Sequence, residues 1–305
     1  MSDGLLVQTD TIPRTVKIGD RFVGDGKPCW VVMEIGINHN GDIDICKKLI
    51  DIAVENGADA IKLQKRTVDV VYTAEELAAL RENPFGPTNG DLKHGLEFGQ
   101  EAYEEIDQYC KKRGIAWFAS CWDEGSVDFI DQFDPPCYKI ASASLTDANL
   151  LRHTCSKGKP LLISTGMSKP EEVRNAVKLV REQIGDKFIL LHTISTYPSE
   201  NADLNLKAII SLRNDFLVPI GYSGHERGVS PSIMATTLGS CVIERHFTLD
   251  RTMWGSDQAA SLEPKGLSIL IRDIRTWEIA CGDGQKALHP KEVPIMKKLR
   301  RKNTL

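Results

Sequence analysis

The sequence lacks several signals that would place a chain outside the soluble globular class. It has no run of about 18 apolar residues that could cross a bilayer. Its first residues, Met1 to Gly4, are not a basic segment followed by an apolar one, which is the pattern of a secretory signal. Its eight cysteines include no Cys-x-x-Cys pair, which argues against a zinc cluster or a disulfide framework. We therefore expect a cytoplasmic protein that is not associated with a membrane.

Excess charge of one sign is also absent. The formal net charge is −4 over 305 residues, so any anionic ligand must be held by local cations. The basic tail, about residues 291–305, has no aromatic residues among its lysines and arginines, which is typical of a solvated helix end. We expect small-molecule partners and no nucleic acid.

Short apolar runs alternate with amphipathic stretches along the whole chain, which is the pattern of repeated strand–helix units. Eight such units that close on themselves form a (β/α)8 barrel, and barrels of this length are commonly one domain, here residues 1–305. The runs are Val31–Gly36, Ala60–Gln64, Ala116–Trp122, Cys137–Ala141, Leu161–Gly166, Phe188–Ser195, Val218–Ser223 and Cys241–Thr248.

An open doubly wound sheet is the competing α/β architecture. The sequence has no Gly-x-Gly-x-x-Gly turn, and eight regular units favour closure. Amphipathic patterns predict helices over Ile45–Asn56, Pro170–Ile184 and Ala202–Phe216. Glycines in helix-stop positions are Gly57, Gly158, Gly185 and Gly239.

Two segments fall outside the repeat. Residues 15–32 predict an N-terminal hairpin, with Thr15–Val23 and Cys29–Val32 flanking a turn at Gly24–Lys27, which could plug the barrel floor. The connection from Arg66 to Glu101 after the second strand is long and rich in turn residues. Because it follows the carboxyl end of a strand, we expect a functional lid.

Reactive residues of such barrels project from the carboxyl ends of the strands. Lys62 and Lys139 stand inside otherwise apolar strands, where a lysine is costly unless it meets an anion. The pair predicts a ligand with more than one negative charge, although each lysine could instead pair with Glu34 or Glu244. Side chains that could contact the same ligand are Gln64, Ser142, Ser164, Ser195, Tyr197 and Ser223.

Two histidines end neighbouring strands. His225 and His246 could reach one ion, because adjacent strands lie about 5 Å apart. Carboxylates available nearby are Glu34, Glu244 and Asp257. Imidazole with carboxylate and water suits Mn, Fe, Co or Zn better than Ca.

Six segments, in order, resemble the motifs of the sialic acid synthase (N-acetylneuraminate synthase) family, over roughly residues 15–300. The resemblance implies a barrel that condenses phosphoenolpyruvate with N-acetylmannosamine or a related aldose. It also implies release of phosphate and use of Mn²⁺ or a similar ion, with Mg²⁺ or Co²⁺ as alternatives. The segments are Glu34–Gly41, Lys62–Gln64, Tyr138–Ile140, Ser164–Met167, Gly221–His225 and Glu244–Thr248.

The resemblance also implies roles for single residues. The family's metal histidines fall on His225 and His246, and its phosphoenolpyruvate-binding lysines fall on Lys62 and Lys139. Its phosphate-binding serines fall on Ser142, Ser164 and Ser223. Its metal- or sugar-side carboxylates fall on Glu34, Glu244 and Asp257, and its strand-six tyrosine falls on Tyr197.

The sequence departs from the family pattern in four places. The usual Ser-Thr-Pro at the end of strand three is Ser120-Cys121-Trp122, a glutamate after strand four is Ser144, and a strand-six asparagine is Ser195. We also expect the chain to lack the family's C-terminal antifreeze-like domain. These departures bear more on the sugar than on phosphoenolpyruvate, and the long connection is a candidate replacement cap.

Two other functions remain open on the sequence. A Schiff-base pyruvate aldolase would use an interior lysine as nucleophile, but the sixth strand, where such a lysine commonly stands, has none. A catalytically inactive barrel could act as a binding or regulatory subunit. Barrels of this kind often pair, so we expect a homodimer.

Overall fold

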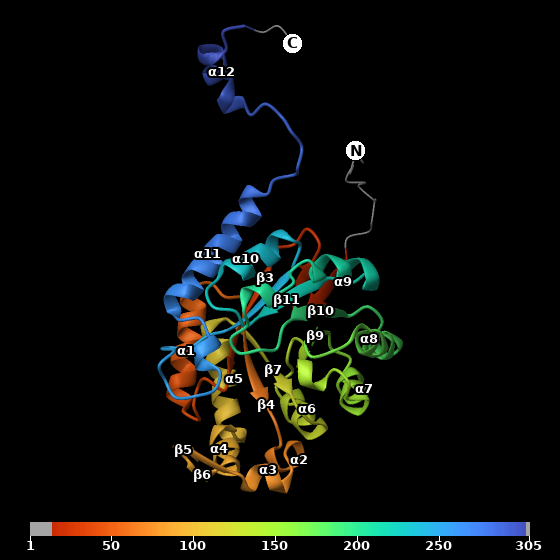
Figure 1. Ribbon diagram of the computed structural model, residues 1–305, viewed down its shortest axis with the longest axis vertical. Coiled ribbons are helices and arrows are strands. Elements are labelled where there is room, and N and C mark those ends of the chain that lie inside the picture. Colours follow the sequence, from red (N-terminus) through yellow and green to blue (C-terminus); the bar gives the residue numbers. More distant parts are fainter. Residues whose placement is uncertain (1–13, 303–305) are drawn as a thin grey trace.

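The computed structural model describes residues 14–302. Eight parallel strands close into a barrel in the order β3, β4, β7, β8, β9, β10, β11, β12, and helices surround it (Figure 1). The strands are β3 (Trp30–Gly36), β4 (Ala60–Lys65), β7 (Ala116–Cys121), β8 (Tyr138–Ile140), β9 (Leu161–Ser164), β10 (Phe188–Thr193), β11 (Ile220–Gly224) and β12 (Val242–His246). The covering helices are α1 (Ile43–Glu55), α5 (Gln100–Arg113), α6 (Glu124–Asp131), α7 (Ala148–Ser156), α8 (Pro170–Ile184), α9 (Ala208–Phe216), α10 (Ser230–Thr237) and α11 (Pro264–Ala280). The predicted (β/α)8 barrel is confirmed.

Helix boundaries follow local signals in the sequence. Helix α8 begins with Pro170, whose fixed φ suits the first helical position, and the Glu172 carboxylate accepts a hydrogen bond from the backbone N–H of Lys169. The helix ends before Gly185, which has a φ of 63°. The predicted helix over Ala202–Phe216 is too long, because Asn205 has a φ of 44° and α9 begins only at Ala208.

The hydrophobic core has two layers. The inner layer fills the barrel below its mouth and includes Trp30, Phe118 and Ile189. The outer layer lies between the strands and the surrounding helices. This division follows from the pleat, because successive side chains of a strand face opposite sides of the sheet.

The N-terminal hairpin closes the floor of the barrel, as predicted, but the position of its turn and its second strand were predicted wrongly. Strands β1 (Thr15–Ile18) and β2 (Arg21–Gly24) pair antiparallel across a turn at Gly19 and Asp20. The predicted turn at Gly24–Lys27 instead connects β2 to the first barrel strand, closed by the Lys27 N–H donating to the Gly24 carbonyl at 3.1 Å. The shorter turn lets the hairpin bury Val16, Ile18 and Val23 in the inner layer.

The long connection after β4 is folded and is not a simple loop. It contains helices α2 (Val68–Val71), α3 (Ala74–Ala78) and α4 (Asn89–Leu96) and an antiparallel pair of strands, β5 (Leu80–Asn83) and β6 (Gly86–Thr88). This excursion projects at the end of the barrel opposite to both termini (Figure 1). Capping boxes at Thr73 and Thr88 begin α3 and α4, which explains why a turn-rich sequence is ordered.

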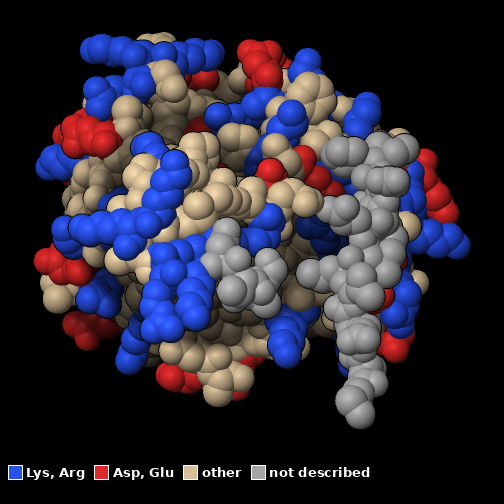
Figure 2. Space-filling model, turned by 90° about the horizontal axis from the view of Figure 1, so that it is seen from above, with Lys and Arg blue, Asp and Glu red and all other residues tan. Residues whose placement is uncertain are grey.

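The C-terminal segment leaves the barrel after α11 and forms the short exposed helix α12 (Val293–Leu299), in keeping with a solvated helix end. Lys and Arg side chains are spread over that end of the molecule, with Asp and Glu side chains among them (Figure 2). Within residues 14–302, no helix combines the length and apolar character that a membrane span requires.

One ion pair lies entirely inside the outer layer. Arg245 faces away from the barrel axis, and its Nη1 lies 2.8 Å from Glu226 Oε1, with both side chains fully buried. The guanidinium also donates to the Gly228 carbonyl at 2.9 Å, and the Tyr222 hydroxyl donates to Glu226 Oε2 at 2.8 Å. Removing one partner of such a pair leaves an uncompensated buried charge.

We therefore expect Arg245→Met to lower the free energy of unfolding by about 3–5 kcal/mol, because Glu226 would be left charged in the core. Urea or guanidinium denaturation of the purified protein measures this. Lys111→Met is the matched control: its pair with Asp107 is exposed, so its loss should cost less than about 1 kcal/mol. Equal effects of the two substitutions would contradict the prediction.

Candidate active site

A cavity of about 200 Å³ opens at the carboxyl ends of the barrel strands. It is lined by every predicted site residue except Asp257. Alternation along the strands explains this, because Lys62 and Gln64 of β4, and Glu244 and His246 of β12, are two residues apart and share the inner face. No residue of the excursion between Thr67 and Gly99 lines the cavity, so the expected lid is not one of its walls.

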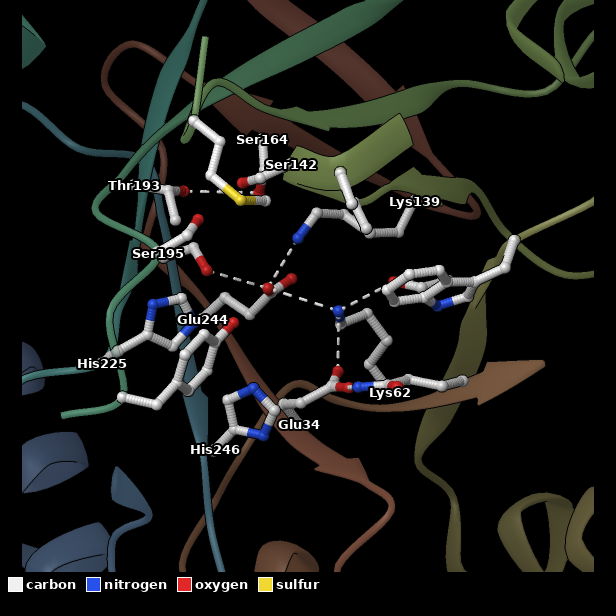
Figure 3. A pocket seen from close by; sticks show the side chains of 18 residues that line it. Glu34, Lys62, Lys139, Ser142, Ser164, Thr193, Ser195, His225, Glu244 and His246 are labelled. Carbon is white, nitrogen blue, oxygen red and sulfur yellow. Dashed lines mark hydrogen bonds and ion pairs between the residues drawn. The ribbon is translucent and has the colours of Figure 1, made fainter. Parts of the chain in front are cut away.

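Four buried charges form a network at the centre of the cavity (Figure 3). Lys62 Nζ lies 2.7 Å from Glu34 Oε2 and 3.3 Å from Glu244 Oε1, and Lys139 Nζ lies 2.6 Å from Glu244 Oε1. The structure therefore shows the salt bridges that the sequence offered as an alternative to ligand binding. Because both ammonium groups also line the cavity, the two interpretations are compatible.

The network sets unequal pKa values for its members. Burial raises the pKa of Glu34 to about 7, against the lowering effect of Lys62. For Glu244 burial is outweighed by Lys139 and Lys62, which hold its pKa well below the usual range. Burial lowers the pKa of Lys139 to about 8, whereas for Lys62 Glu244 and Glu34 outweigh burial and raise its pKa.

His225 and His246 lie side by side, with ring centroids 5.6 Å apart. Burial lowers their pKa values to about 3 and about 4, so both rings are neutral at pH 7. His225 Nδ1 lies 2.8 Å from the Ile194 carbonyl, which can only accept, so Nδ1 carries the proton and Nε2 keeps its lone pair. His246 Nδ1 is buried without a hydrogen-bond partner.

This donor set fits a divalent transition metal with an open coordination sphere. Neutral imidazoles are its usual ligands, and an oriented His225 with an unpartnered His246 nitrogen is what such a site requires. Asp257 approaches His246 Nδ1 only to 3.9 Å. Within the described part of the chain no group of three or more His, Cys, Asp or Glu side chains is arranged to hold an ion, so further ligands would come from substrate or water.

Hydroxyl groups line much of the cavity wall, with Ser142 and Ser164 away from the histidines and Ser195 next to His225 (Figure 3). Ser142, Ser164, Ser195 and Ser223 all reach it, and Ser195 Oγ has no hydrogen-bond partner. Gly166 stands between them: a Cβ there would lie 2.4 Å from Ser195 Oγ and 2.7 Å from Ser142 Oγ. A glycine is therefore required for these hydroxyls to converge.

A second glycine, Gly36, lies beside Glu34 and His246, where a larger residue would not fit. It has a φ of 54°, and a Cβ there would lie 3.0 Å from Glu34 Oε1 and 3.3 Å from His246 Cε1. Gln64 fills the remaining space and donates from Nε2 to Glu34 Oε1 at 3.0 Å. The Tyr197 ring covers His225, with centroids 4.1 Å apart.

Sequence reasoning did not assign six residues of the cavity wall to the site, and three of these are polar or aromatic: Ser120, Trp122 and Thr193. Ser120 Oγ accepts from Lys62 Nζ at 3.1 Å, and Thr193 Oγ1 donates to Ser164 Oγ at 3.4 Å. The period-two alternation of β7 could have identified Ser120, since Phe118 and Ser120 share the inner face. Trp122 follows the end of β7, where no sequence period applies.

Comparison with known proteins shows the family of this chain. The model of the NeuB family matches residues 49–286. The human N-acetylneuraminate-9-phosphate synthase is 38% identical over 282 residues, covering 92% of this chain and 78% of that protein. The N,N'-diacetyllegionaminic acid synthase of Legionella pneumophila is 36% identical over 289 residues, covering 92% and 81%.

A solved structure shows the same fold. The N-acetylneuraminic acid synthetase of Leptospira borgpetersenii, crystallised in complex with citrate, superposes with a TM-score of 0.83 at 27% identity, covering 96% of this chain and 100% of that one. The chain therefore belongs to the NeuB family and is an enzyme of the sialic acid synthase type, as its six motifs predicted.

Proposed function

We propose that this enzyme condenses phosphoenolpyruvate with a sugar aldehyde, N-acetylmannosamine or a related aldose, to give a 2-keto-3-deoxy sugar acid and phosphate. The observation that carries the proposal is the single cavity in which Lys62, Lys139 and a group of hydroxyls face a pair of neutral histidines. The lysines and hydroxyls suit a phosphorylated carboxylate, and the two histidines suit a metal ion.

Phosphoenolpyruvate would be held by the network and the hydroxyls. Lys62 and Lys139 are the cations for its carboxylate and phosphate, and Ser142, Ser164 and Ser223 supply donors for the phosphate. Glu34 and Glu244 balance the two lysines before the substrate enters. Holding both charged ends of the substrate fixes its methylene carbon for attack on the aldehyde.

His225 and His246 would hold a divalent cation, for which we propose Mn²⁺, with Co²⁺ and Mg²⁺ as candidates to be compared. Bound there, it would supply Lewis-acid polarisation of the aldehyde oxygen. Gln64 and Tyr197 border the same side of the cavity and are placed to contact the sugar. Asp257, whose Oδ2 lies 3.9 Å from His246 Nδ1, would face the same cation.

The reaction forms one carbon–carbon bond and then releases phosphate. C3 of phosphoenolpyruvate attacks the aldehyde carbon, and the aldehyde oxygen takes up a proton to become a hydroxyl group. Water adds to C2 of the resulting cation and gives up a proton, and the tetrahedral centre then breaks its C2–O bond to phosphate and leaves the ketone. Glu34 is the carboxyl group suited to accept the proton of the water, because its pKa of about 7 is near the working pH. Glu244 stays ionised and keeps both ammonium groups in position.

The two alternatives are tested by separate observations. A Schiff-base aldolase would be trapped by borohydride with pyruvate, and Lys139, with its pKa lowered to about 8, would be the lysine modified. Lys139 is instead paired with Glu244 at 2.6 Å. An inactive barrel would bind neither a transition metal nor phosphoenolpyruvate.

Phosphate release from phosphoenolpyruvate, measured with N-acetylmannosamine, mannose, arabinose and their phosphate esters, tests the proposal directly. We expect turnover with one sugar class in Mn²⁺, its loss after EDTA treatment and its return when Mn²⁺ is added back. Release without sugar, or full activity after EDTA with no metal found by elemental analysis, would contradict the proposal.

His246→Ala should reduce kcat by at least about 100-fold, because the site would keep one imidazole ligand, while circular dichroism stays unchanged. His153→Ala is the matched control, since His153 lies on α7 and pairs with Asp128 away from the cavity. A near-normal rate for His246→Ala would show that His246 is not a metal ligand needed for turnover.

Affinity for phosphoenolpyruvate should fall at high pH. The Lys139 ammonium is fully charged well below its pKa of about 8 and loses its proton as the pH rises through that value. The KM for phosphoenolpyruvate should therefore be constant near pH 7 and rise by up to about tenfold per pH unit above 8. Lys139→Arg, which stays charged, should remove this dependence; an unchanged alkaline profile in the variant would assign it to another group.

A further inference from the structure

Two side chains next to the cavity carry donors that nothing in the described structure satisfies. The indole Nε1 of Trp122 and the Nε of Arg66 are both buried without a hydrogen-bond partner. The guanidinium carbon of Arg66 lies 4.8 Å from the centre of the Trp122 ring, so the two groups form one stacked pair. Buried donors are normally satisfied, and two adjacent exceptions beside a cavity indicate a missing acceptor.

The pair is held rigidly from both sides. The Trp122 backbone N–H donates to the Lys65 carbonyl at 3.0 Å. The residues that follow Arg66 and Trp122 are also joined, because the backbone N–H and the hydroxyl of Thr67 donate hydrogen bonds to the Asp123 carboxylate at 2.7 and 2.9 Å. Arg66 also donates to Gln64 Oε1. The stack is therefore fixed in place before any ligand enters.

The stack lies nearer the mouth than the proposed phosphoenolpyruvate contacts. Arg66 and Trp122 come directly after the carboxyl ends of β4 and β7, which point to the mouth. Gln64 and Ser120, which pair in register, lie deeper in these two strands, and Lys62 lies deeper still. A ligand that sits above phosphoenolpyruvate, and reaches it from the mouth, is the acceptor sugar.

The two unpartnered donors favour a neutral oxygen as their acceptor. Glu97 already faces the outer edge of the guanidinium, with Oε1 3.5 Å from Arg66 Nη1, and Glu97 Oε2 also lies 3.4 Å from Lys65 Nζ. The buried donors without a partner are one N–H group on each side chain, Arg66 Nε and Trp122 Nε1, which suits a single carbonyl or hydroxyl oxygen.

We propose that Arg66 and Trp122 bind an acyl carbonyl or hydroxyl oxygen of the acceptor sugar and thereby select the sugar. This inference rests on the proposed condensation and assigns its acceptor subsite to the ends of β4 and β7. The subsite lies on strands other than those of the two histidines, so the sugar spans the mouth of the cavity between its aldehyde and this oxygen.

Trp122→Phe tests the subsite, because it removes the indole N–H and keeps an aromatic ring beneath Arg66. With N-acetylmannosamine or mannose, whichever the wild type uses, we expect the sugar KM to rise about tenfold, the effect of one lost hydrogen bond. The KM for phosphoenolpyruvate should not change. The circular dichroism spectrum should not change, so that a raised sugar KM reports on binding and not on unfolding.

Trp117→Phe is the matched control. Its indole donates to Asp107 Oδ1 at 3.1 Å, outside the cavity, so this substitution should leave the sugar KM unchanged and lower the melting temperature. An unchanged sugar KM in Trp122→Phe, or a raised KM for phosphoenolpyruvate, would overturn the inference. No turnover by the wild type with any sugar would instead overturn the proposed function.

Discussion

The mutual compensation of four buried charges is the constraint on which this molecule depends. Lys62, Lys139, Glu34 and Glu244 come from four barrel strands, and their side chains are almost fully excluded from solvent. Any one of them alone would be too costly to bury as an ion. Barrel closure brings the strands into one ring, so each charge meets a partner within about one hydrogen-bond length.

The surroundings of this network determine at which end of the barrel the cavity opens and which groups line it. Below it, the hairpin residues and the inner hydrophobic layer close the floor, so ligands can enter only from the carboxyl ends of the strands. Above it, the cavity wall carries hydroxyls toward β8–β11 and imidazoles on β12 and just after β11, with apolar surface from residues such as Met167 and Trp122 between them. In the proposed reaction, the phosphorylated anion and the sugar aldehyde would thus approach each other over the ion pairs.

The outer face of the same strands carries a structural ion pair. On β12 the side chain between Glu244 and His246 is Arg245, which points away from the cavity and pairs with Glu226 beneath α10. One strand therefore contributes to the reactive network on one face and to a structural ion pair on the other. The network of Glu226 with Tyr222 and Ser232 holds the loop after β11, from which His225 reaches the cavity.

Sequence alone determined the barrel and most of the cavity wall, because both follow from short-range rules. Apolar runs at regular spacing predicted the strands, and lysines within them marked the inner face. What the sequence could not determine was which groups meet: that Lys62 bridges both glutamates, that Asp257 does not line the cavity, and that the hairpin turns at Gly19. It also did not show that Arg66 stacks on Trp122 with a free donor on each. These features depend on the stagger between neighbouring strands and on loop conformation. Both are determined by packing of the whole barrel and produce no periodic pattern in the sequence.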